Sequence, residues 1–179
     1  HDFEYKPTTN VAQNFNTVIY DGQAADLSVT GVGFTPDLVW VKCRDVDNSH
    51  VLSDTVRGGD GTRQYFLMSD NANGQSSSDQ IKTIDSDGFT VFGDRSATNR
   101  DTQEYVAWCF KAGGAPSGSD TVSIDGTSYA DEAAAGLTAG TIAVDGISAN
   151  NDLGFSIVKY QGDTLAGTIG HGLDSAPEL

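Results

Sequence analysis

The chain has 179 residues and carries a formal net charge of −15 at pH 7. Its length suits one domain with part of another, or two small domains. Hydrophobic residues make up 37% of the sequence, enough for a packed core, which argues against a chain that is disordered throughout. Because so negative a surface repels phosphate backbones and anionic lipid headgroups, we expect no nucleic-acid partner and no membrane insertion.

The composition predicts an all-β protein. Asp outnumbers Glu by twenty-one to four, and the chain holds 21 Gly but only 10 Lys and Arg together. Asp and Gly favour turns, whereas Glu, Lys and Arg favour helix surfaces, so the bias indicates strands joined by loops. Cys43 and Cys109 stand in apolar, strand-like runs, where two buried thiols are favoured over a disulfide.

An internal repeat divides the chain. Residues 15–22 read Phe-Asn-Thr-Val-Ile-Tyr-Asp-Gly, and residues 155–162, 140 positions later, read Phe-Ser-Ile-Val-Lys-Tyr-Gln-Gly. The Gly-Val-Gly-Phe run at 31–34 likewise returns as Gly-His-Gly-Leu at 170–173. Self-similarity of this kind is typical of repeat architectures, so we expect one complete unit and the start of a second. The expected division is an incoming segment at 1–14, a sandwich at 15–114, a connector at 115–153 and an incomplete second repeat at 154–179.

The first unit is predicted to be an antiparallel β-sandwich of the jelly-roll type. Apolar runs separated by Asp-Gly, Asn-Gly and Gly-Gly turn signals have the rhythm of a sandwich. The runs around Trp40 and Trp108 are apolar at nearly every position, so we expect central strands covered on both faces and both indole rings in the core. In chain order the expected strands are 15–20, 25–30, 37–44, 50–54, 63–68, 80–84, 89–92 and 104–111.

The connector is predicted to be a small β-hairpin with a short helix. A linker rich in Gly, Pro and Ser precedes it, and strands are expected at 121–124 and 141–144, each followed by an Asp-Gly turn. Between these strands, the segment 129–136 is predicted to be helical, because acidic residues lie near its start and Gly136 ends it.

The sequence does not predict an enzyme. A β-sandwich glycosidase needs two carboxylates at a fixed separation. None of the four Glu residues has an acidic partner two or four positions further along a predicted strand. A serine nucleophile is equally unsupported, because no Gly-x-Ser-x-Gly run is present and His50 and His171 fall in different repeat units.

Two acidic pairs are candidates for Ca²⁺, the one cofactor that the sequence raises. Asp45 and Asp47 place oxygens at alternate positions, as in the opening of a Ca²⁺ loop, but the Gly and the distant Glu of such a loop are missing. Asp85 and Asp87 form a second, weaker pair in a hairpin-turn sequence. The alternative for both pairs is a solvated turn whose side chains bond to nearby backbone.

Carbohydrate recognition is the remaining chemistry that suits an acidic sandwich. An exposed aromatic ring stacks on a sugar face, while Asp and Asn accept hydrogen bonds from its hydroxyl groups. Variable loops on a rigid sandwich are the usual place for such sites. The candidate residues, in or beside the polar stretch 69–79, are Tyr65, Asp70, Asn71 and Asn73.

Three strings in order resemble a known repeat domain. They are Gly-Phe-Thr-Pro-Asp-Leu-Val-Trp-Val-Lys at 33–42, His-Val-Leu-Ser-Asp-Thr-Val-Arg-Gly at 50–58 and Tyr-Val-Ala-Trp-Cys-Phe-Lys-Ala-Gly at 105–113. The domain is frequent in tail-fibre and other virion proteins of marine bacteriophages, including cyanophages. The resemblance implies a concanavalin A-like (laminin-G-like) sandwich. It also covers the connector, the repeated strand at 154–160 and the Gly-His-Gly at 170–172, and so spans roughly residues 15 to 179.

The resemblance also implies a function without catalysis, and it supplies no catalytic residues. The expected protein is a structural and interaction module of a phage tail fibre or extracellular filament, at the virion surface or outside the cell. Its expected partners are copies of itself, in a homotrimer, or neighbouring repeats and virion proteins, together with a host cell-surface glycan. The alternative is a carbohydrate-binding, lectin-like adhesin of a bacterial surface or secreted protein.

Overall fold

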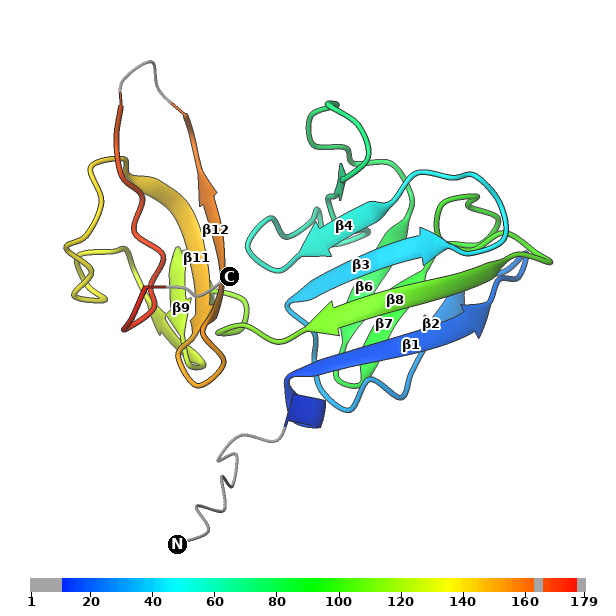
Figure 1. Cartoon of the computed structure of the whole chain (residues 1–179), viewed down its shortest axis with the longest axis horizontal. Helices are drawn as coiled ribbons and strands as arrows, with labels where there is room; N and C mark the ends of the chain where they lie inside the picture. Colours follow the sequence, from blue (N-terminus) through cyan, green and yellow to red (C-terminus); the bar gives the residue numbers. More distant parts are fainter. Residues whose placement is uncertain (1–10, 163–165, 177–179) are drawn as a thin grey trace, which may run out of the picture.

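The computed structural model describes residues 11–162 and 166–176 of the chain. Within these ranges the regular structure consists of strands and one 3₁₀ turn, η1 (Val11–Gln13), which confirms the all-β prediction. The strands form a β-sandwich with a smaller four-stranded sheet beside it (Figure 1). No helix among the described residues has the length and apolar character needed to cross a membrane.

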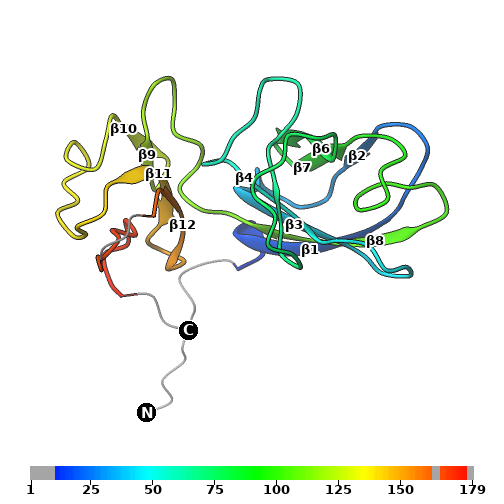
Figure 2. The same cartoon turned by 90° about the horizontal axis from the view of Figure 1, so that it is seen from above.

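The sandwich consists of two antiparallel sheets of unequal width (Figure 2). The wider sheet, in order across it, contains β1 (Phe15–Asp21), β8 (Glu104–Phe110), β3 (Leu38–Cys43), β4 (Val51–Asp54) and β5 (Leu67–Met68). The narrower sheet contains β2 (Leu27–Val29), β7 (Gly88–Val91) and β6 (Ile81–Asp85). The strands expected in this unit are therefore present, although the one expected at 63–68 is reduced to two residues.

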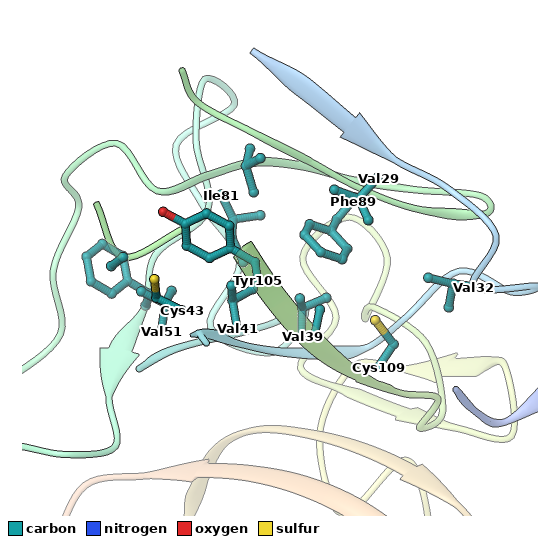
Figure 3. Packing of buried hydrophobic residues seen from close by; sticks show 14 of the residues in the cluster. Val29, Val32, Val39, Val41, Cys43, Val51, Ile81, Phe89, Tyr105 and Cys109 are labelled. Atoms are coloured by element: carbon teal, nitrogen blue, oxygen red, sulfur yellow. The ribbon is translucent and has the colours of Figure 1, made fainter. Parts of the chain in front are cut away.

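The main core lies between these two sheets, because alternate residues of each strand point inward. Figure 3 shows Tyr105 and its neighbours from the wider sheet packed against Ile81 and Phe89 of the narrower sheet. Cys43 and Cys109 are also in this core as free, buried thiols, as the sequence predicts. Burial raises the pKa of Cys109 to about 12, so its thiol stays protonated and unreactive.

Trp40 and Trp108 do not lie in this core, so the prediction of two core indoles is wrong. Val39 and Val41 on either side of Trp40 are fully buried, which directs Trp40 to the opposite face, where it is half-buried. Trp108 is half-buried in the same way between two buried neighbours. An antiparallel sheet covered on one side has a single inward face, so an unbroken apolar run places half of its residues outside.

The smaller sheet has strand order β10-β9-β11-β12 and a core of its own. β11 pairs antiparallel with β12 and parallel with β9, while β9 pairs antiparallel with β10. Val122, Ile147 and Ala149 are fully buried in its core. The strands are β9 (Val122–Ile124), β10 (Thr127–Tyr129), β11 (Val144–Asn150) and β12 (Phe155–Tyr160). β12, whose sequence repeats that of β1, is thus paired with a connector strand.

The short helix predicted at 129–136 is absent, which corrects the description of the connector. The segment after β10 forms turns, in which the Ala135 N–H donates to the Asp131 carbonyl (3.1 Å). Gly136, with a φ of +72°, ends the segment at once. A single turn lacks the successive hydrogen bonds that offset the cost of helix nucleation.

The second strand of the connector also differs from its prediction. It was expected at 141–144 with Asp145-Gly146 as a turn, but β11 begins at Val144 and contains both residues at a register shift. A side chain at Gly146 would collide with Val56 of the sandwich. Gly146 therefore lies inside a strand, where its missing side chain allows Val56 to pack closely. An Asp-Gly pair in the sequence can mark such a position as well as a turn.

The linker between the two sheets is held by one buried carboxylate. Asp37, directly before β3, accepts hydrogen bonds from the N–H groups of Ala112 (2.7 Å) and Gly114 (3.1 Å) and from the Thr55 hydroxyl (3.0 Å). Asp37 is only 2% exposed, and this burial raises the pKa of its carboxyl group. The linker is therefore fixed where it leaves β8, although its composition is that of a flexible one.

Candidate functional site

The wider sheet has an outer face that is built from the residues alternating with the core positions. In Figure 2 this face is turned away from the narrower sheet. Cross-strand register aligns its side chains in rows, which makes the face continuous. Its members on β1, β3 and β8 are Phe15, Thr17 and Ile19, then Leu38, Trp40 and Lys42, then Val106, Trp108 and Phe110.

Aromatic rings run across this outer face. Trp40 and Trp108 are direct cross-strand partners, with ring centroids 5.2 Å apart and planes inclined by 52°. The Phe110 ring lies 4.7 Å from Phe15 on the neighbouring strand. On its other side Phe110 stacks on Phe155 of β12 at 5.3 Å, so the aromatic surface reaches the smaller sheet.

The outer face can bind a flat, weakly polar surface such as one side of a sugar ring. Half-buried indoles offer a broad apolar platform at a small cost in side-chain entropy. The Trp40 Nε1–H is buried and has no hydrogen-bond partner among the described residues. An unpaired buried donor costs about 1–3 kcal/mol.

The predicted sugar-binding loop borders this face. Asp70, Asn71 and Asn73 lie together in the exposed loop after β5. The Asp70 carboxylate accepts a hydrogen bond from the His50 N–H (3.1 Å), which lowers the pKa of Asp70. The His50 ring in turn lies 6.4 Å from the nearer indole of the outer face. Tyr65, the fourth predicted residue, is half-buried in the segment before β5.

The two predicted acidic pairs lie in different loops. Asp45 and Asp47 are exposed in the loop between β3 and β4, where the Asp45 carboxylate accepts a hydrogen bond from the Cys43 thiol (3.2 Å), which lowers the pKa of Asp45. Asp85 and Asp87 lie at the turn between β6 and β7. Across the described residues, no three His, Cys, Asp or Glu side chains are grouped so as to hold a metal ion.

The carboxylates of Asp87 and Asp85 already accept hydrogen bonds from other groups of the protein. The two oxygens of Asp87 accept the N–H groups of Gly33 (2.6 Å) and Gly31 (3.1 Å), and these bonds lower the pKa of Asp87. Asp85 accepts the Thr90 hydroxyl (2.8 Å). The Asp87 bonds tie the β6–β7 turn to the loop that follows β2.

A polar cavity of about 480 Å³ lies elsewhere on the sandwich and gathers three of the five arginines of the chain. Asp79 pairs with both Arg63 and Arg95, and its Oδ2 lies 3.1 Å from the latter. Arg100 pairs more loosely with Asp94 (3.5 Å). Arg63 also pairs with Asp60 (3.5 Å), so the three positive side chains face three negative ones and balanced ion pairs surround the cavity.

Sequence reasoning missed both the outer face and the arginine cavity. The outward direction of Trp40 could have been recognised, because Trp40 shares strand parity with Lys42, and Trp108 shares it with Glu104. The arginines come from positions 63, 95 and 100, and no spacing in the sequence brings them together. Their meeting depends on loops of both sheets.

A comparison with protein families finds one model that matches almost the whole chain. The profile of a family described as a domain of unknown function (DUF7483) matches residues 10–179. The chain belongs to the DUF7483 family. This DUF7483 match covers the sandwich, the linker and the smaller sheet together, so the family unit includes the connector as well as the sandwich. Neither the curated proteins nor the solved structures that were searched contain a match to this DUF7483 chain.

Proposed function

We propose that this chain is a non-enzymatic structural and interaction module of a phage tail fibre or extracellular filament, built from tandem concanavalin A-like sandwiches. The observation that carries the proposal is that β12 repeats the sequence of β1. β12 lies outside the sandwich, in a second sheet with its own core. Units that share a strand pattern and contact their neighbours in series are the basis of repeat filaments.

Attachment to host-surface glycans is part of this proposal. The outer face offers paired indoles beside the exposed Asp70 loop, so apolar stacking and hydroxyl recognition are available together. The same observation favours the alternative, a lectin-like adhesin of a bacterial surface or secreted protein. The two functions differ in where the protein is located rather than in what the face binds.

Location is tested by antibody labelling. Antibodies raised against the folded chain, with gold-labelled secondary antibodies, are applied to virions and to cells from the source of the sequence. We expect label on virion appendages or extracellular filaments. Label spread over a bacterial surface supports the adhesin, and label confined to the cell interior contradicts both functions.

Glycan attachment is tested on an array of host polysaccharides, with Ca²⁺ and with a chelator. We expect Trp108→Ala to lose binding while the chain stays folded, because the half-buried indole should cost less than the ~3–5 kcal/mol of a fully buried one. Tyr160→Ala, which removes an exposed aromatic from β12, is the control and should bind normally. Equal binding by the two variants would exclude the outer face as the attachment site.

A further inference from the structure

β1 lies at the border of the wider sheet, so one of its backbone edges has no strand beside it among the described residues. Its even-numbered residues bond to β8, as the two ends of the ladder show. The Lys111 N–H donates to the Asn14 carbonyl (2.7 Å), and the Gly22 N–H donates to the Gln103 carbonyl (2.8 Å). Successive residues of a strand direct their backbone groups to opposite edges, so the odd-numbered residues of 15–21 point to the open edge.

This open edge lacks the usual protection of a free strand. Edges that stay unpaired commonly carry Lys, Pro or a bulge, whereas β1 contains no Lys and no proline, and its one charged residue is Asp21 at its end. Ile19 is 69% exposed beside it. The Asn16 side-chain oxygen accepts the Thr17 N–H (2.9 Å), and the Asn16 amide donates to the Gly31 carbonyl (3.2 Å) and the Val32 carbonyl (3.1 Å). A bound strand would have to displace this cap from the Thr17 N–H.

The pairing of β12 can be compared directly, because β12 repeats β1. β11 directs its odd-numbered residues to β9: the Ile147 N–H donates to the Thr121 carbonyl, and the Asp125 N–H donates to the Ala149 carbonyl, each at 2.9 Å. The even-numbered residues of β11 must therefore bond to β12, where they lie opposite residues 155, 157 and 159. Those residues correspond to 15, 17 and 19 of β1.

β11 thus occupies the edge of β12 that corresponds, through the repeat, to the open edge of β1. The core-facing sides agree as well. Val18 packs against the sandwich core, and Val158, its equivalent, packs against the smaller core. The other edge of β12 corresponds to the one through which β1 bonds to β8. Each of these two equivalent strands is therefore paired through one edge only, β1 with β8 and β12 with β11, and the two paired edges are opposite ones.

We propose that the open edge of β1 binds the β11 strand of a second copy of this unit that precedes it in a tandem. There β1 takes the place that β12 has here, antiparallel and in the register that β11 has with β12. In that register Ser148 of the second copy lies opposite Thr17, and its Ile147 and Ala149 reach the border of the sandwich core beside Val18. The inference rests on the proposed tandem arrangement, because it makes the connector sheet of one unit continuous with the sandwich sheet of the next.

The register is tested by disulfide trapping with a synthetic peptide of residues 143–151 that carries Ser148→Cys. A peptide is needed because β11 of the intact chain is already paired with β12. Directly opposed residues have Cα atoms about 5.5 Å apart, within the range of a disulfide. We expect the full chain with Thr17→Cys to be trapped at least tenfold more than the chain with Ile19→Cys, which lies out of register. Equal trapping, or none, overturns the proposal.

The edge itself is tested by removing one outward N–H. Ile19→Pro deletes a donor that does not bond to β8, so the chain should keep its melting temperature to within a few degrees. We expect at least tenfold weaker binding of the fluorescently labelled peptide, while Ile19→Val binds as the unaltered chain does. Unchanged binding by folded Ile19→Pro contradicts the assignment. Antibody labelling does not depend on this edge, so failure here is distinguishable from failure of the proposed function.

Discussion

The Asp37 carboxylate joins three parts of the chain that are distant in sequence. It accepts hydrogen bonds from the Thr55 hydroxyl and from the Ala112 and Gly114 N–H groups of the linker. Burial disfavours the charged form of this carboxyl group, which is why its pKa is raised in spite of those hydrogen bonds. Asp37 therefore fastens the linker to the sandwich.

Replacing Asp37 with alanine should lower the free energy of unfolding by at least about 2 kcal/mol, because buried donors are left without an acceptor. Asp101→Ala, which removes an exposed carboxylate from a loop, is the control and should change it little. Urea unfolding monitored by circular dichroism measures both. A loss no larger than that of the control would mean that water replaces the carboxylate.

The pKa of Asp87 is shifted in the opposite direction to that of Asp37, so Asp87 makes the free energy of unfolding fall as the pH falls. Its pKa is lowered by the N–H groups of Gly33 and Gly31, so its contribution is complete above the ordinary Asp pKa and is lost as the pH falls through the lowered value. We expect Asp87→Ala to lose less stability than the unaltered chain between pH 5 and pH 3. Parallel pH profiles of the urea midpoint would contradict this.

The strands of the sandwich were predicted correctly, but the direction of their side chains was not. Apolar runs and turn signals located β3 and β8, but an unbroken apolar run does not state which residues face a second layer. Trp40 and Trp108 were therefore predicted on the wrong side. Asp70, Asn71 and Asn73 do share a loop, because a contiguous polar stretch stays together in space.

The smaller sheet shows where local patterns fail at the level of elements. Its helix was predicted from end signals alone, and its Asp145-Gly146 pair from turn chemistry alone. The helix is absent because one turn does not offset the cost of nucleation, whereas the outcome at Asp145-Gly146 depends on contacts from distant residues. Among these contacts is the packing of Gly146 against Val56, which no local window contains.

Close packing of the linker on the smaller sheet should make Gly113 intolerant of substitution. A Cβ atom there would lie 2.3 Å from the Ala149 carbonyl oxygen and 2.4 Å from that of Ser123, both of them backbone atoms. We expect Gly113→Ala to destabilise the chain by about 1–3 kcal/mol, the usual range for overpacking. Thermal unfolding measures it. Gly74→Ala, in open space, is the control, and an equal effect of the two would contradict the packing argument.

At the scale of the whole molecule, two cores of unequal size share one chain. The sandwich core includes Tyr105, Phe66 and Phe89, whereas the smaller core has Val122, Ile147 and Ala149 as its fully buried residues. Because stabilisation by burial follows the apolar area removed from water, the smaller sheet has much less of it.

Hydrogen exchange should therefore distinguish the two sheets. We expect the amides of β11 and β12 to exchange at least tenfold faster than those of β3 and β8, since the smaller sheet opens at a lower free energy. Mass spectrometry of peptic fragments measures this. Equal protection would show that the linker couples both sheets into one cooperative unit.

The register of β1 with β8 has a mechanical consequence. Phe15, the first residue of β1, is paired with Phe110, the last residue of β8, so the chain enters and leaves the wider sheet at the same end of one strand pair. Tension applied through residues 14 and 111 would separate these strands from that end, breaking the ladder bonds one after another rather than all at once. A strand bound along the outer side of β1 would add resistance against such unzipping.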